Sequence, residues 1–248
     1  PMQRVACDVV LPVWGQLDHV RQGLEGLLAQ ENADLVIHLI DDGSPENTDD
    51  FLRYWATHPQ IRAYRNVCNL SQFTSFNNVS RYFETGLVAV QDGDDVALPH
   101  RIHLAGNTLR LAGADIFGSA VVVFDGNEPM SDEGWDRLLP DIKVRRWKNL
   151  GICAWPTPGV FWFLFNPSMV LRTDVFRGLG GFGDFGSAVR NRCGHDIEFC
   201  LRAYYRGQRF ALSRQPTVLY RQHPAQTTRN PVTGFGTDAE GWTSQEAR

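Results

Sequence analysis

The sequence predicts an α/β fold in which a mainly parallel central sheet is flanked by helices. Runs of apolar, β-branched residues alternate with amphipathic stretches through the first half of the chain. This alternation is typical of a parallel sheet covered by helices. The chain has 248 residues, of which 43% are hydrophobic, and this fits one large domain with a substantial core. Because no internal repeat or low-complexity linker interrupts it, we expect a single domain over residues 1–248.

Hydrophobic spacing supports each expected element of the first half. Short apolar runs indicate strands at 5–13, 35–40, 61–65, 87–91 and 114–124. Apolar residues three and four positions apart indicate helices at about 16–30, 51–55, 71–83 and 99–111. The last of these begins with Pro99, a residue favoured in the first turn of a helix.

The second half of the chain is less regular. We expect a strand at 168–172, a glycine-rich loop at 178–186, a helix at 194–206 and a short final strand at 217–220. The polar tail over 224–248 is expected to be loosely held.

Charge and composition exclude several classes of protein. A net charge of −4 and a pI near 6.0 give no support for nucleic-acid binding. No apolar run reaches the 18 residues of a membrane-spanning helix, so we expect at most peripheral contact with a membrane. Five scattered cysteines indicate reduced thiols. The expected location is therefore the cytoplasm, extending to the inner face of the membrane.

The most informative motif is Asp92-Gly93-Asp94-Asp95, directly after an apolar strand. Glycine allows a sharp backbone turn at little steric cost. Three carboxylates so close together repel one another, and a divalent cation such as Mg²⁺ or Mn²⁺ would relieve that repulsion. Ligands of open α/β sheets bind beyond the carboxyl ends of strands. The alternative is a solvated acidic turn that caps the next helix.

Three further polar groups stand at the ends of predicted elements: Asp41-Asp42, His195-Asp196 and His223. Each has a simpler explanation. Asp42 can form an Asx-turn with Ser44, Asp196 can cap the helix that it opens, and His223 can be a packed structural histidine. Their order along the chain, together with the acidic motif, favours a shared site.

These motifs resemble those of the family-2 glycosyltransferases, which have the GT-A fold, and the resemblance covers residues 5–223. The segments that carry it are Pro12-Val13-Trp14, Ile40-Asp41-Asp42-Gly43-Ser44, Asp92-Gly93-Asp94-Asp95, His195-Asp196 and Tyr220-Arg221-Gln222-His223. Two positions depart from the family pattern: Trp14-Gly15 replaces Tyr-Asn, and His195 replaces a glutamate. The resemblance implies a nucleotide-sugar-binding half over 5–124 and an acceptor-binding half over 125–223.

The resemblance also implies roles for individual residues. The donor site would include Pro12, Val13, Trp14, Asp42, Asp92, Gly93 and Asp94. Within it, Asp42 would contact the base, and Asp92 the ribose or the metal. Asp94 would bind Mn²⁺ or Mg²⁺ directly, together with His223. Asp196 would be the general base. His195, which replaces the family's glutamate, is a candidate for acceptor contacts. Trp155 and Trp162 could stack on a sugar ring of the acceptor, and the alternative is that they belong to the core.

The implied activity is an inverting, metal-dependent transfer of a sugar from a nucleotide-diphosphate donor, with UDP-sugars favoured. The implied acceptor is a hydroxyl of a saccharide or a lipid-linked molecule, as in the assembly of bacterial surface polysaccharides. Two alternatives remain open: a nucleotidyltransferase, and a non-catalytic relative that only binds nucleotide-sugars. Release of pyrophosphate would favour the first, and failure to hydrolyse the donor would favour the second.

Overall fold

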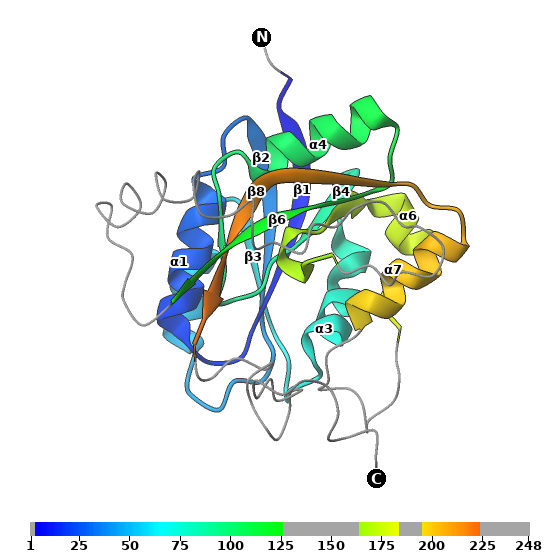
Figure 1. Ribbon diagram of the computed structural model, residues 1–248. Helices are drawn as coiled ribbons and strands as arrows, with labels where there is room; N and C mark the ends of the chain where they lie inside the picture. Colours follow the sequence, from blue (N-terminus) through cyan, green and yellow to red (C-terminus); the bar gives the residue numbers. More distant parts are fainter. Residues whose placement is uncertain (1–2, 126–163, 184–194, 224–248) are drawn as a thin grey trace, which may run out of the picture.

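The computed structural model describes residues 3–125, 164–183 and 195–223. Its described strands form a single eight-stranded sheet in the order β3-β2-β1-β4-β7-β6-β8-β5 (Figure 1). The predicted α/β class, with a mainly parallel sheet and a smaller mixed region, is confirmed. None of the described helices is long and apolar enough to cross a membrane.

One half of the sheet is parallel throughout. It contains β1 (Val5–Val13), β2 (Ala33–Asp41), β3 (Ile61–Arg65) and β4 (Leu87–Val90). In register, Val13 lies opposite Asp41, and Val10 lies opposite Val90. The carboxyl ends of β1, β2 and β4 therefore meet at one edge of the sheet.

The other half is mixed. It contains β5 (Val96–Ala97), β6 (Ile116–Asp125), β7 (Val170–Arg172) and β8 (Phe210–Gln222). Strand β7 runs antiparallel to both β4 and β6, and β8 runs parallel to β6. Because β7 is antiparallel to β4, the residues that precede β7 lie at the carboxyl end of β4.

Helices cover both faces of the sheet. Strand side chains point alternately to opposite sides, so apolar strands present two faces that need to be buried. Cys7, Val9, Leu11 and Val13 of β1 face a core shared with α1 (Leu17–Leu28), α2 (Asp49–Ala56) and α4 (Arg101–Ala112). The opposite core contains apolar side chains of α3 (Gln72–Val79), α6 (Thr173–Gly178) and α7 (His195–Tyr205). Figure 1 shows α1 and the group of α3, α6 and α7 on opposite sides of the sheet.

Several element boundaries differ from the sequence prediction. The region 71–83 is divided between α3 and a 3-10 helix, η1 (Ser80–Tyr82). Helix α4 begins at Arg101, so Pro99 precedes it. Helix α6 and strand β5 were not predicted. Helix α6 has six residues and β5 has two, and segments this short do not show a hydrophobic period.

Strand β8 is much longer than the predicted 217–220. Its pairing with β6 shifts register between Ser119 and Val121, where the partners change from Ser213 to Val218. The intervening residues are polar and include Pro216, as is usual at a bulge. This polar interruption conceals the first half of the strand from an analysis based on apolar runs.

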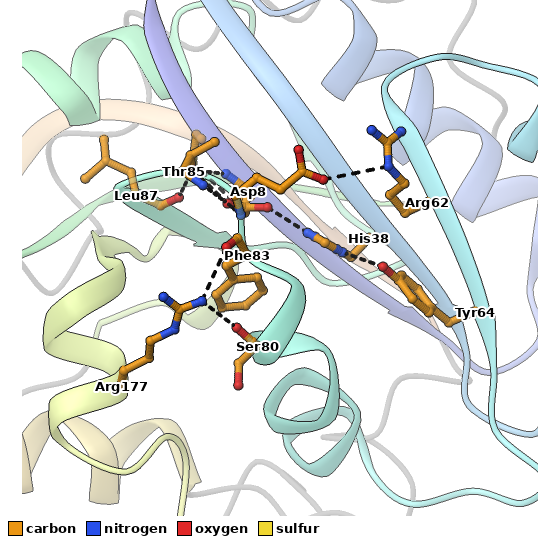
Figure 2. Close-up of polar contacts among 11 residues, drawn as sticks. Asp8, His38, Arg62, Tyr64, Ser80, Phe83, Thr85, Leu87 and Arg177 are labelled. Carbon is orange, nitrogen blue, oxygen red and sulfur yellow. Dashed lines mark hydrogen bonds and ion pairs between the residues drawn. The ribbon is translucent and has the colours of Figure 1, made fainter.

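A polar cluster centred on the buried Asp8 and His38 ties the parallel strands together below the carboxyl edge (Figure 2). Asp8 of β1 is inaccessible to solvent, and its carboxylate lies 2.7 Å from His38 Nε2 on β2. It also accepts hydrogen bonds from the Thr85 amide at 2.8 Å, the Thr85 hydroxyl at 2.8 Å and the Glu84 amide at 3.0 Å. On the other side of the imidazole, His38 Nδ1 lies 3.1 Å from the Tyr64 hydroxyl on β3.

Burial alone would raise the pKa of Asp8, but hydrogen bonds from His38 and Thr85 outweigh it, and the pKa is lowered overall. A carboxylate whose pKa is lower in the folded state stabilises the fold above its unfolded pKa. That contribution disappears as the pH falls through the folded pKa. The cluster therefore links the stability of the sheet to an ionised Asp8.

We predict that Asp8→Asn lowers the free energy of unfolding at pH 7 by about 2–4 kcal/mol, because it removes the charged member of a buried pair. The difference between the variant and the wild type should shrink as the pH falls below about 4. Urea denaturation between pH 3 and pH 7 measures both effects. Asp50→Asn is the control, since the Asp50–Arg53 pair is exposed and an exposed ion pair contributes little to stability. A pH-independent difference would contradict this account.

Candidate active site

The candidate site lies where the connectivity of the sheet reverses. From β1 the chain proceeds outward to β2 and β3, and then returns to the opposite side of β1 as β4. Such a switch point is where open α/β sheets bind ligands. The residues that follow β1, β2 and β4 lie there, and the Asp42 amide donates to the Val13 carbonyl at 2.7 Å.

The turn that carries the acidic motif is held from below by buried polar side chains. Gln91 Nε2 donates to the carbonyls of Asp92 and Asp95, at 3.0 and 2.9 Å. Arg101 in turn donates to Gln91 Oε1 at 2.6 Å and to the Val90 carbonyl at 2.5 Å. Gln91 and Arg101 are both fully buried, so the conformation of the acidic turn is fixed by the core.

Gly93 is required for a different reason from the one predicted. It does not have the positive φ that favours glycine in a sharp turn. A Cβ at this position would instead lie 3.2 Å from the Pro12 carbonyl oxygen. Gly93 thus permits the acidic turn to pack closely against the end of β1.

The three carboxylates of the turn differ in their electrostatic environments. Burial, reinforced by the charges of Asp94 and Asp196, raises the pKa of Asp92 to about 7. Burial and the charges of Asp94 and Asp92 raise the pKa of Asp95 well above its usual value. Asp95 is fully buried, whereas 25% of the Asp94 side chain is exposed. The turn therefore holds more negative charge than its surroundings can readily accommodate.

The end of β8 contacts this turn through Arg221 and His223. The Arg221 amide donates to Asp95 Oδ1 at 2.8 Å, and its Nε donates to the Asp94 carbonyl at 2.7 Å. Its guanidinium lies over the Phe124 ring, 4.7 Å from the centroid. His223 Nε2 lies 3.0 Å from Asp94 Oδ2. The predicted neighbours Asp94 and His223 are thus brought together from residues 129 positions apart.

A carboxylate oxygen and an imidazole nitrogen on one small patch are suitable ligands for Mn²⁺, and the excess negative charge favours a cation there. Within the described residues, however, no three His, Cys, Asp or Glu side chains converge closely enough to hold a metal by themselves. Any cation bound here would need further ligands from another source.

Asp41, the last residue of β2, and Asp42, which follows it, make separate sets of contacts. Asp42 Oδ1 accepts hydrogen bonds from Asn66 Nδ2 at 2.7 Å, from the Leu70 amide at 3.0 Å and from the Ser75 hydroxyl at 2.8 Å. The Ser44 amide donates to Asp41 at 2.9 Å. The Asx-turn considered for Asp42 is therefore formed by Asp41.

Asp41 is a structural residue in other respects as well. Burial opposes its ionisation, but hydrogen bonds from Ser44 and Thr48 and the nearby Arg65 guanidinium outweigh burial, so its pKa is lowered. Arg65 Nε lies 3.0 Å from Asp41 Oδ2. Both carboxylate oxygens of Asp41 are thus engaged within the fold.

Asp196 lies in the first turn of α7 and is buried, with 8% of its surface exposed. Its charge is one of those that raise the pKa of Asp92, so these two acids from distant parts of the chain share one electrostatic environment. The neighbouring His195 is buried and stacks on Phe73, with ring centroids 4.6 Å apart. His195 therefore packs against α3, whatever further contact it makes.

The remaining predicted residues fall into two groups. Pro12 and Val13 end β1 beside the acidic turn, and Trp14 follows them with 58% of its surface exposed. Trp155 and Trp162 lie outside the described residues.

Sequence reasoning overlooked Asn166, which belongs to the 3-10 helix η2 (Asn166–Ser168) before β7. Its Nδ2 donates to Asp92 Oδ1 at 2.9 Å. No motif marks this residue, and only the antiparallel pairing of β4 with β7 brings it to the acidic turn.

Comparison with known proteins agrees with this architecture. The family model described as glycosyl transferase family 2 matches residues 8–163. A protein of Bacillus subtilis (strain 168) named glycosyltransferase EpsE is 25% identical over 205 residues, which cover 82% of this chain and 68% of EpsE.

Solved structures share the fold at low sequence identity. The S. aureus TarS fragment 1-349, in complex with UDP-GlcNAc, superposes with a TM-score of 0.67 and 13% identity. The mannosyltransferase PcManGT from Pyrobaculum calidifontis, in complex with GDP-Man and Mn²⁺, gives a TM-score of 0.62 and 18% identity. Each match covers 90% of this chain, but only 60% of the TarS fragment and 58% of PcManGT.

The family match spans more than half of the chain, and it begins at Asp8 and includes the segments that follow β1, β2 and β4. The fold and the position of the acidic turn agree with it. The chain therefore belongs to glycosyl transferase family 2 and has the GT-A fold.

Proposed function

We propose that this protein transfers a sugar from a nucleotide-diphosphate donor to an acceptor hydroxyl, with inversion at the anomeric carbon. The observation that carries the proposal is the acidic turn at the β1/β4 switch point. Asp94 is in contact there with His223, and the charge of Asp196 acts on Asp92. The residues proposed to bind the metal, to bind the donor and to act as the base would thus lie together at one edge of the sheet.

The nucleotide would occupy the ends of β1 and β2. The indole of Trp14 is exposed and offers a flat surface on which a base can stack. The three donors to Asp42 all reach Oδ1, so Oδ2 would accept from the base. TarS was solved in complex with UDP-GlcNAc, and this supports UDP-sugars as the first donors to test.

Asp94 and His223 would hold Mn²⁺ or Mg²⁺, with Asp92 beside them and the donor diphosphate completing the ligands. Such a cation neutralises the charge that develops on the leaving diphosphate. The PcManGT complex with GDP-Man and Mn²⁺ supports the proposal by analogy. The chain's own contribution is to fix Asp94 through the Gln91–Arg101 support and His223 through β8.

Asp196 would be the general base. An oxygen of the acceptor bonds to the anomeric carbon as the bond from that carbon to the diphosphate oxygen breaks, and the hydroxyl proton passes to Asp196. Attack from the side opposite the leaving group inverts the anomeric centre. The ionised form of a carboxylate is favoured in the first turn of a helix, and Asp196 lies in the first turn of α7.

The acceptor would be a saccharide or a lipid-linked hydroxyl, and the latter would bring the protein to the inner face of the membrane from the cytoplasm. His195, Trp155 and Trp162 remain the residues proposed for acceptor contacts. Incubation with donor and acceptor distinguishes the classes of enzyme, because glycosyl transfer releases a nucleoside diphosphate and nucleotidyl transfer releases pyrophosphate.

We predict that Asp94→Asn and His223→Ala each weaken Mn²⁺ binding in the presence of UDP by at least the roughly 10- to 100-fold caused by loss of an outer-shell partner. Titration calorimetry measures the affinity, and thermal unfolding verifies the fold. Asp18→Asn is the control, because it removes an exposed charge in the first turn of α1 without removing a proposed ligand. Full transfer activity in excess chelator would overturn metal dependence.

We predict that Asp196→Asn retains the fold and donor binding but lowers the transfer rate by about 10²–10⁴-fold, the usual contribution of a general base. Asparagine caps a helix about as well as aspartate, so a purely structural residue would tolerate the change. Glu198→Gln is the matched control on the same helix, since Glu198 pairs with Arg202 at 2.6 Å. Transfer by Asp196→Asn at close to the wild-type rate would assign the base elsewhere.

A further inference from the structure

The Asn166 side chain has one satisfied end and one unsatisfied end. Its Nδ2 donates to Asp92 Oδ1 at 2.9 Å. Its Oδ1 is buried and has no hydrogen-bond partner among the described residues. Only 8% of the residue is exposed. Buried amide oxygens in folded proteins are nearly always paired, so this one requires an explanation.

The amide orientation follows from its neighbour. An ionised carboxylate accepts hydrogen bonds and does not donate them. With Asp92 ionised, as it would be beside a bound cation, the amide nitrogen belongs on the Asp92 side. The reverse orientation would place two acceptor oxygens against each other. Oδ1 is therefore directed away from Asp92 and lacks a donor.

The backbone that carries Asn166 is firmly held. The Met169 amide donates to the Asn166 carbonyl at 3.0 Å, and the Met169 carbonyl accepts from the Val90 amide at 3.0 Å. The Ser168 hydroxyl donates to the Phe165 carbonyl at 2.8 Å and accepts from the Ser119 amide at 3.1 Å. A group placed this rigidly is suited to binding a ligand at little cost in ordering.

The strand order indicates which ligand group would reach Asn166. Along the sheet the order is β2-β1-β4-β7. The proposed base contacts follow β1 and β2, and the proposed diphosphate and cation contacts follow β4. Asn166 lies one step further, at the start of β7. A donor that extends from base through diphosphate to sugar along this edge would place its sugar beside Asn166.

We propose that Asn166 Oδ1 accepts a hydrogen bond from a hydroxyl of the transferred sugar, while its Nδ2 orients Asp92. This assignment rests on the proposed function and deepens it by naming a sugar-recognition residue. A buried acceptor discriminates strongly against a ligand that lacks the hydroxyl, because the acceptor is then left unpaired. Asn166 would thus help to determine which sugars are used.

The test compares Asn166→Ala with wild type by titration calorimetry in Mn²⁺. The probes are UDP-glucose, UDP-GlcNAc and GDP-mannose, each paired with its nucleoside diphosphate. For the nucleotide-sugar that the wild type binds, the variant should lose about tenfold in affinity, as expected for one hydrogen bond to a buried group. Affinity for the matching nucleoside diphosphate should fall by a clearly smaller factor, because this probe lacks the transferred sugar and is affected only through the lost Nδ2 contact to Asp92.

Ser168→Ala is the matched control. Its hydroxyl bonds only to the backbone of Phe165 and Ser119 among the described residues. It should lower thermal stability and should weaken the nucleotide-sugars and the nucleoside diphosphates equally, if at all. Asn166→Ala should unfold within a few degrees of wild type, because it also removes an unsatisfied buried oxygen.

Single-position deoxy analogues of the bound donor provide the second measurement. Wild type should bind one analogue about tenfold more weakly than the parent, and Asn166→Ala should bind both alike. Equal losses for the nucleotide-sugar and the nucleoside diphosphate, or no loss at all, would overturn the role of Asn166 alone. Failure of the wild type to bind any nucleotide-sugar or nucleoside diphosphate in the panel would overturn the proposed function, and this inference with it.

Discussion

The structure depends on the support of a negatively charged turn by two fully buried arginines. Arg101 holds Gln91, which holds the turn from below, and Arg221 bonds to the Asp94 carbonyl and the Asp95 carboxylate from β8. Burial lowers the pKa of both guanidinium groups, that of Arg101 to about 10, against the opposing charge of nearby acids. Buried charges are costly unless they are paired. The sheet edge is therefore built around opposite charges that require one another.

This support leaves the charge of the turn incompletely balanced. Gln91 is neutral, and Arg101 donates to Gln91 Oε1 and to the Val90 carbonyl. The contacts of the Arg221 guanidinium include the Asp94 carbonyl and Gln22 Oε1. Burial and the mutual repulsion of the acids raise the pKa values of Asp92 and Asp95, and the nearby arginines offset this only in part. The same imbalance that disfavours three ionised carboxylates would favour a bound cation. A turn in which every acid is paired with a cationic side chain would have a lower electrostatic free energy, but it would attract a metal–diphosphate unit less strongly.

The sequence was sufficient to predict the parallel half of the fold and the motif residues, because apolar strands and the acids that follow them are adjacent in the chain. The contact of Asp94 with His223 followed from recognising both motifs together. Asn166, by contrast, is brought to Asp92 by long-range strand pairing alone, and nothing in its neighbours indicates this. The Asx-turn with Ser44 was considered for Asp42 but is formed by Asp41, because two adjacent acids before a turn look alike in the sequence.

The Asp8–His38–Tyr64 cluster shows that the two halves of β1 have different roles. It lies in the first half of the strand and is closed by hydrogen bonds within the sheet. The last residues of the same strand border the acidic turn, where hydrogen-bonding groups such as Asn166 Oδ1 and Asp95 Oδ2 lack a described partner. Satisfied polar groups fix the position of a strand, whereas unsatisfied ones are available to a ligand. The first half of β1 thus carries polar groups that are paired within the protein and make the sheet rigid. The end of β1 borders polar groups whose remaining hydrogen bonds a substrate can supply.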